Sequence, residues 1–162
     1  MAFTKTTLQY ATQLTVTEIL AGNVVGLSDK LVKHTTLNKS ELLDSTTTPP
    51  VTLVVSNAQA GSGTIDLTSM VGTNDTAVDG SGLKVQAAKF ANPSTNANAI
   101  TVKFGASDAY LLGGAAWTFI LEPGMEIVAY GNDATPDIAA GAKDIDVAAT
   151  GVQPLNYTIV MG

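Results

Sequence analysis

The side chains that could do chemistry are few, and the only histidine is the first to consider. His34 lies between Lys33 and Thr35, in a stretch without a clear secondary-structure pattern. Serine–histidine–aspartate catalysis would have to use this one imidazole. The chain has no cysteine, which excludes disulfides, thiolate catalysis and cysteine-ligated metals. We therefore expect no histidine-based catalytic site, no metal site and no cofactor.

Paired carboxylates are the remaining route to acid–base catalysis, as in glycoside hydrolysis. Glu122 and Glu126 flank a tight turn, and Asp144 and Asp146 share one face of an expected strand. The residues that alternate with both pairs are apolar, so the carboxylates are expected on solvated outer faces. The sequence indicates no catalytic residue, and we expect a protein that is not an enzyme.

Two loops rich in oxygen ligands suggest calcium binding, because Ca²⁺ takes roughly six to eight oxygen ligands. Neither loop has the ordered alternation of an EF-hand, and Asn and Asp also stabilise turns. Two glycine pairs lack the lysine and the following helix of a phosphate-binding loop, so turn formation explains them. The first candidate calcium loop contains Asn74, Asp75 and Asp79, and the second contains Asn132, Asp133 and Asp137. The two glycine pairs lie in the segments Gly61–Gly63 and Gly80–Gly82.

Aromatic residues could form a platform for sugars, with Trp117, Phe119, Tyr110 and Tyr130 as its members. Trp117 is in register with Phe119 and Leu121 on an expected strand. A tryptophan in such a stripe usually packs in the core. Core packing is therefore the favoured interpretation.

The elements that would position these residues are strands, because apolar and polar residues alternate with period two. Eight strands are expected: Val51–Asn57, Gly63–Met70, Leu83–Lys89, Ala99–Phe104, Ala116–Leu121, Met125–Tyr130, Asp144–Ala149 and Leu155–Met161. The inward residues are expected to be Ile100, Val102, Phe104, Trp117, Phe119, Leu121, Ile127, Ile145, Val147, Leu155, Tyr157 and Ile159. The outward residues are expected to be Thr101, Lys103, Thr118, Asp144, Asp146, Asn156 and Thr158.

The connections between these strands carry turn signals. Glu122-Pro-Gly124 suits a type II turn, which predicts a hairpin between Trp117–Leu121 and Met125–Tyr130. Short strands without helices between them are typical of an all-β antiparallel sandwich. Eight strands predict a jelly roll. An immunoglobulin-like sandwich is the alternative, although its paired cysteines are absent.

The beginning of the chain differs from the rest, which predicts two parts: an irregular N-terminal arm and linker over 1–50, and a sandwich over 51–162. Leu14, Val16 and Glu18 could begin a strand, and Asn38-Lys-Ser-Glu41 could head one helical turn. The run Asp44–Pro50 is the expected linker, because its two prolines favour extended structure. Apolar residues of the arm are predicted to be buried against the sandwich or an adjacent subunit: Leu27, Leu31, Val32, Leu42 and Leu43.

Composition and charge narrow the function classes. The chain has 162 residues, is 45% apolar and has a net charge of -6. All eight basic residues are lysine, and the acidic surface disfavours nucleic-acid binding. Residues 1–43 carry four lysines and three acids, a net charge of +1, whereas 44–162 carry four lysines and eleven acids, a net charge of -7. The absence of a secretory signal and of a bilayer-spanning apolar run predicts a soluble protein made in a cytoplasm.

Three stretches resemble small virion structural proteins of tailed bacteriophages, in particular jelly-roll proteins that decorate or cement capsids. They are Asn98–Gly105, Ala116–Tyr130 and Asp144–Gly162, and the resemblance covers about residues 50–162. It implies a homotrimer that docks on the lattice of the major capsid protein, located in the virion. It assigns no role to any individual residue.

The expected function is therefore that of a non-enzymatic capsid decoration protein without nucleic-acid, membrane or small-molecule ligands. The N-terminal segment would face the lattice and the acidic sandwich would face outward. The alternative is a carbohydrate- or surface-binding β-sandwich module, for example part of a phage fibre or spike. An exposed aromatic cluster would favour that module.

Overall fold

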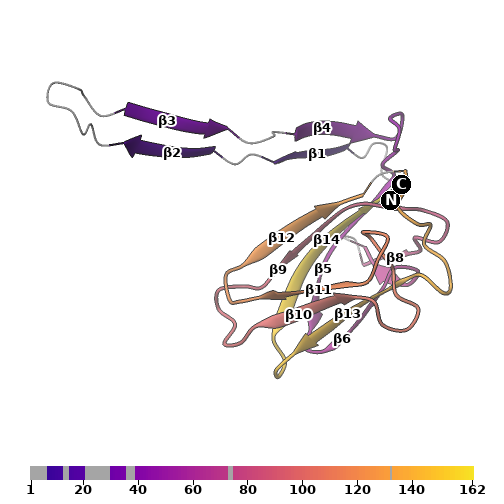
Figure 1. The fold of residues 1–162 in the computed structure, drawn as a ribbon. Coiled ribbons are helices and arrows are strands. Elements are labelled where there is room, and N and C mark those ends of the chain that lie inside the picture. Colours follow the sequence, from indigo (N-terminus) through magenta and orange to yellow (C-terminus); the bar gives the residue numbers. More distant parts are fainter. Residues whose placement is uncertain (1–6, 13–14, 21–29, 36–38, 73–74, 132) are drawn as a thin grey trace, which may run out of the picture. The chain divides into compact units, whose positions relative to one another are not determined.

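A computed structural model of the chain describes residues 7–12, 15–20, 30–35, 39–72, 75–131 and 133–162. The described residues form strands and turns, with no helix among them (Figure 1). The chain divides into two compact units. One comprises Leu8–Leu42 and the other contains Leu43–Gly162.

The first unit is built from four strands. They are β1 (Thr7–Thr12), β2 (Thr15–Leu20), β3 (Lys30–Thr35) and β4 (Lys39–Asp44). β2 and β3 pair antiparallel, from Thr15 opposite Thr35 to Leu20 opposite Lys30, and β1 pairs with β4. The chain therefore runs out through β1 and β2 and returns through β3 and β4, and we call these four strands the N-terminal hairpin.

The prediction of an irregular arm is wrong for these residues. Strands form where threonine, valine and isoleucine are frequent, since β-branched residues favour the pleated conformation. The expected helical turn after Asn38 is also wrong, because Ser40–Leu43 lies within β4. Asn38, Leu14 and Leu27 lie outside the described residues.

The apolar residues at the end of the hairpin have different environments. Leu43 is buried, with 7% of its surface exposed, as predicted. Leu42 is 64% exposed, so it is not buried within the single chain. Its burial against an adjacent subunit stays a prediction. The side chains of Leu31 and Val32 lie outside the description.

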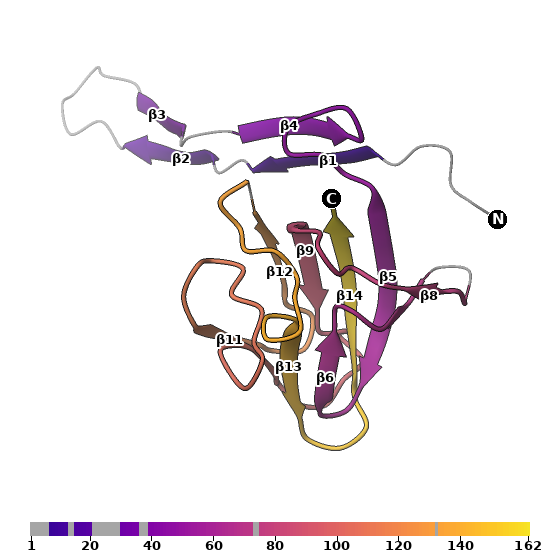
Figure 2. The same ribbon diagram turned by 90° about the vertical axis from the view of Figure 1, so that its right-hand side faces the viewer.

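The second unit is a sandwich of two packed four-stranded antiparallel sheets, one in the order β11-β10-β13-β6 and the other in the order β12-β9-β14-β5 (Figure 2). Two short strands, β7 and β8, form a separate pair. The bounds are β5 (Leu53–Ala60), β6 (Gly63–Asp66), β7 (Met70–Val71), β8 (Ala77–Val78), β9 (Val85–Ala91), β10 (Ile100–Phe104), β11 (Trp117–Leu121), β12 (Glu126–Tyr130), β13 (Asp144–Ala149) and β14 (Pro154–Met161).

The pairing of the eight long strands is nested. β5 pairs with β14, β6 with β13, β9 with β12 and β10 with β11. Each predicted strand overlaps one of these eight. The predicted strand Gly63–Met70 is shorter than expected, because a turn follows β6 in which Ser69 donates its N–H to the carbonyl of Asp66 at 3.1 Å.

The core lies between the two sheets and confirms the predicted inward and outward faces. Ile100, Val102 and Phe104 are fully buried on β10, while Lys103 between them is exposed. On β11, Thr118 is more exposed than its neighbours Trp117 and Phe119, which are half-buried. The fully buried positions also include Ile145, Leu155 and Ile159. The alternation therefore predicted the buried face of β10, β11, β13 and most of β14, whereas β9 is buried at four consecutive positions, Val85–Ala88.

The predicted hairpin between β11 and β12 is wrong. The turn itself is present, with Met125 donating its N–H to the carbonyl of Glu122 at 2.9 Å and Gly124 at a φ of 85°. However, β11 and β12 belong to different sheets. After the turn, Asn92 donates its N–H to the carbonyl of Met125 at 2.9 Å, which leads β12 into pairing with β9. The turn is therefore an arch between the two sheets.

Candidate functional site

The catalytic candidates of the sequence lie on different elements and form no catalytic arrangement among the described side chains. His34 lies on β3 opposite Val16, and its side chain lies outside the description. Glu122 and Glu126 are both exposed, and Glu126 Oε2 lies 2.7 Å from Lys89 Nζ. This geometry gives Glu126 a surface ion pair rather than a second carboxylate as its partner.

Asp144 and Asp146 do share one face of β13, where both are half-buried. Thr64 Oγ1 donates a hydrogen bond to Asp146 Oδ1 at 3.0 Å. Burial raises the pKa of Asp144, and the attraction of Lys143 only partly offsets this. Asp146 is therefore bonded to Thr64 on the neighbouring strand, and Asp144 lies near Lys143. Such surroundings are typical of carboxylates that stabilise a sheet rather than of a catalytic pair.

An ion pair between Lys143 and Asp66 is a polar contact that sequence reasoning missed. The lysine reaches the carboxylate Oδ2, and Thr68 donates both its N–H and its hydroxyl to Oδ1 at 2.8 and 2.6 Å. Burial acts to raise the pKa of Asp66, but the hydrogen bonds from Lys143 and Thr68 outweigh it, so the pKa is lowered. The pKa of Lys143 is raised, chiefly by its hydrogen bond to Asp66. This pair ties the turn after β6 to the start of β13.

One acid in each candidate calcium loop has a structural partner. Asp79 Oδ1 accepts from the N–H and the hydroxyl of Ser81, which lowers the pKa of Asp79. Asp137 forms an ion pair with Lys84 at 2.9 Å. Asn74 and Asn132 lie outside the described residues. Among the residues that the structure describes, no group of three or more His, Cys, Asp or Glu side chains could hold a metal ion.

The glycine pairs act in turns. Gly61 and Gly82 adopt φ values of 68° and 78°, which favour glycine. Gly80 is buried, and a Cβ there would lie 2.7 Å from the carbonyl oxygen of Leu67. These roles agree with the interpretation of both pairs as turn residues.

Trp117 and Phe119 are half-buried and pack against the core, next to the buried rings of Phe104 and Phe90. Trp117 stacks on Phe104 with ring centroids 4.7 Å apart and an interplanar angle of 4°. Phe119 lies 5.1 Å from Trp117 and 5.8 Å from Phe90. Tyr110 is fully buried; its hydroxyl accepts the N–H of Val85 and donates to the carbonyl of Pro136, and burial raises its pKa to about 12. The favoured prediction of core packing is confirmed for Trp117 and Phe119.

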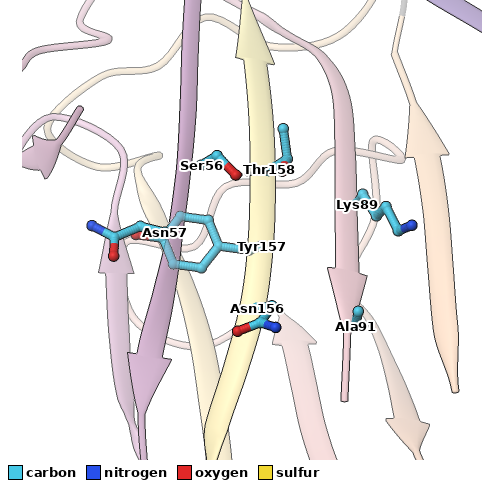
Figure 3. A pocket seen from close by; sticks show the side chains of 7 residues that line it. All are labelled: Ser56, Asn57, Lys89, Ala91, Asn156, Tyr157 and Thr158. Atoms are coloured by element: carbon cyan, nitrogen blue, oxygen red, sulfur yellow. Dashed lines mark hydrogen bonds between the residues drawn. The ribbon is translucent and has the colours of Figure 1, made fainter. Parts of the chain in front are cut away.

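The described surface has an open polar groove on the outer side of the sheet that contains β5, β9 and β14 (Figure 3). Its volume is about 440 Å³. Thr158 lies in register between Ser56 and Lys89, and the Ser56 and Thr158 hydroxyls are 2.9 Å apart. The lining residues are Ser56, Asn57, Lys89, Ala91, Asn156, Tyr157 and Thr158.

The groove can hydrogen-bond a polar ligand, but it holds no group suited to proton transfer. Its one ammonium, on Lys89, is paired with Glu126. Burial raises the pKa of Tyr157, which keeps that phenol protonated. The outward positions of Asn156 and Thr158 were predictable from their alternation, but their neighbours on β5 and β9 depend on the sheet order.

Comparisons of the chain with known protein families, with curated proteins and with solved structures find no match. In the part of the chain that the structure describes, no helix is long and apolar enough to cross a membrane. The function is therefore inferred from the residues and the fold.

Proposed function

We propose that the sandwich is a jelly roll and that the protein is a non-enzymatic structural component of a virion. The nested pairing of β5 with β14, β6 with β13, β9 with β12 and β10 with β11 supports the first part, because a jelly roll is a long antiparallel hairpin wound into two sheets. In the alternative, an immunoglobulin-like sandwich, the first two strands share a sheet. Here β5 and β6 lie in different sheets.

Within a virion, the protein acts as a decoration or stabilising protein on the lattice of the major capsid protein, as a homotrimer. The observation that carries this proposal is the division into two unlike units. The sandwich has its own core, with a cluster of buried residues from Val55 to Met161. The described strands of the N-terminal hairpin form two-stranded sheets, which are marginally stable in water without a further surface. Such an element is suited to docking on a partner.

The distribution of charge supports the orientation on the lattice. Residues 8–42 carry three lysines and three acids and are neutral, whereas 44–162 carry a net charge of -7. A neutral hairpin meets a protein surface without long-range repulsion, and an acidic sandwich facing outward keeps particles soluble. The resemblance to capsid decoration proteins agrees with this arrangement.

A carbohydrate- or surface-binding module is the second candidate, and the polar groove favours it. Hydroxyl and amide groups of Ser56, Asn156 and Thr158 could hydrogen-bond a sugar. The packing of Trp117 and Phe119 against the core disfavours it, because both residues are half-buried rather than exposed and Trp117 already stacks on Phe104.

Co-sedimentation tests the proposal. Full-length protein and a fragment of residues 44–162 are each incubated with empty shells assembled from the major capsid protein of the same genome. The full chain is expected to pellet with the shells and the fragment to remain in the supernatant, with thermal unfolding confirming that the fragment is folded. Equal pelleting of both forms would refute docking through the N-terminal hairpin. Retention on a glycan array instead would support the binding module.

A further inference from the structure

The segment that follows β4 and precedes β5 is a closed loop. Its sequence, Asp-Ser-Thr-Thr-Thr-Pro-Pro-Val over residues 44–51, predicts an extended linker. The structure differs, because the N–H of Val51 donates to the carbonyl of Asp44 at 2.9 Å. The two ends of the segment are therefore joined by a hydrogen bond, and we call residues 44–51 the connector loop.

Asp44 is the main acceptor within the connector loop. Its carbonyl accepts the N–H of Thr47 at 3.3 Å in addition to that of Val51. Its carboxylate Oδ1 accepts the N–H of Thr46 at 2.8 Å and the hydroxyl of Thr46 at 2.7 Å. An aspartate side chain that bonds the backbone two residues further on stabilises a turn. Asp44 thus holds the first half of the loop in a turn conformation.

The hydroxyl of Thr47 connects the two halves of the loop. Its oxygen accepts the N–H of Asp44 at 3.0 Å. The same oxygen lies 2.8 Å from the carbonyl of Asp44 and 2.8 Å from the carbonyl of Pro49. A hydroxyl has one proton to donate, so these two carbonyls are alternative acceptors. Removal of this single oxygen would therefore break contacts at both ends of the loop.

The chain is also anchored on both sides of the connector loop. Leu43, directly before the loop, is buried, and Val51 at its end is fully buried. The N–H of Thr52 donates to the carbonyl of Met161 on β14 at 2.8 Å. The polar residues between these anchors are therefore constrained by burial at the ends as well as by hydrogen bonds inside the loop.

We propose that the connector loop is a locked element, which holds the chain between β4 and β5 in one conformation, and that the Thr47 hydroxyl keeps it closed. A linker rich in small polar residues and without internal hydrogen bonds would instead behave as a flexible coil. A partner that binds the N-terminal hairpin then has no need to order the connector loop, and such preorganisation favours binding.

This inference goes beyond the proposed function, since it concerns the free protein and requires neither a capsid nor a trimer. The two proposals can fail separately. A lack of co-sedimentation with shells would leave the locked loop in place, and a flexible loop would leave docking through the hairpin possible.

Nitrogen-15 relaxation of the full chain tests the proposal, because it measures backbone order residue by residue. The order parameters of Ser45, Thr46, Thr47 and Thr48 are expected to be about 0.85, the value of rigid backbone, and to equal those of β5. Order parameters below about 0.6 for these residues in the wild-type chain would overturn the proposal.

Substitutions of threonine test the role of the hydroxyl. Thr47→Val removes the oxygen at nearly constant shape, and it should lower the order parameters of the loop to about 0.6 or less. Thr47→Ser keeps the hydroxyl and should retain the wild-type values. Thr48→Val is the matched control, because Thr48 is exposed and its side chain makes no hydrogen bond within the described part of the chain.

Unchanged order parameters in Thr47→Val, or an equal loss in Thr48→Val, would refute the role of the Thr47 hydroxyl. Wild-type chemical shifts for β10 and β14 in each variant would show that the sandwich is still folded. The wild-type measurement tests the locked loop even where a variant fails to fold.

Discussion

Replacement of Phe104 by alanine is the sharpest test of the core. Phe104 is fully buried at the end of β10 and contacts three other rings. It stacks on Trp117 at 4.7 Å, meets Phe90 edge-on at 6.0 Å and lies 6.2 Å from Phe119. Phe104→Ala therefore removes the ring that links the others.

The expected cost is large because both sheets contribute to this cluster. A buried Phe→Ala change costs about 3–5 kcal/mol, and the lost ring contacts place this site in the upper part of that range. Small domains have a free energy of unfolding of only about 5–15 kcal/mol. At about 4 °C per kcal/mol, the melting temperature should fall by about 15–20 °C.

Chemical and thermal unfolding of the variant would check this value. Thr118→Ala is the matched control on the outer face of β11, and it should change the free energy of unfolding by less than about 0.5 kcal/mol. A loss below about 1 kcal/mol for Phe104→Ala, or an equal loss for both variants, would show that the register of the two strands has been misassigned.

Three further variants test other contacts by denaturant unfolding. Tyr110→Phe should cost about 1–3 kcal/mol, because a buried backbone N–H loses its acceptor; a neutral result would contradict this contact. Gly80→Ala should cost more than Gly141→Ala, because its Cβ would lie 2.7 Å from a backbone oxygen whereas Gly141 has open space and no positive φ; the reverse order would refute the packing. Asp66→Asn should destabilise the protein at neutral pH, since the lowered pKa of Asp66 stabilises the fold above its ordinary value of 3.8. The difference from wild type should close as the pH falls below 3.8, and a constant difference would exclude the ion pair with Lys143 as its cause.

Most of what could be predicted about the sandwich came from the alternation of apolar and polar residues along each strand. The inward and outward residues of β10 and β13 follow from period two alone, because each strand has one face on the core. The alternation did not predict how the turn at Glu122–Met125 connects its two strands. A type II turn between two alternating strands gives the same pattern whether the chain returns in one sheet or arches to the other, and the choice depends on pairing with β9.

The polar contacts of the fold were also beyond sequence reasoning. Lys143 and Asp66 are 77 positions apart, and neither belongs to a local motif. The hairpin strands were missed because glycines and short apolar runs in residues 8–42 hide the period, and their pairing depends on a partner strand elsewhere in the segment. The sequence therefore predicted which side chains of a strand face the core. It did not predict contacts between segments that are far apart along the chain.

A cryo-electron microscopy map of capsid shells incubated with the protein tests the central claim most directly. The map is expected to show threefold groups of sandwiches on the shell, with the Leu8–Leu42 unit against the lattice and the acidic sandwich facing solvent. Shells without added density at saturating protein concentration would contradict the claim. Density in which the sandwich contacts the shell and the Leu8–Leu42 unit points into solvent would contradict it equally.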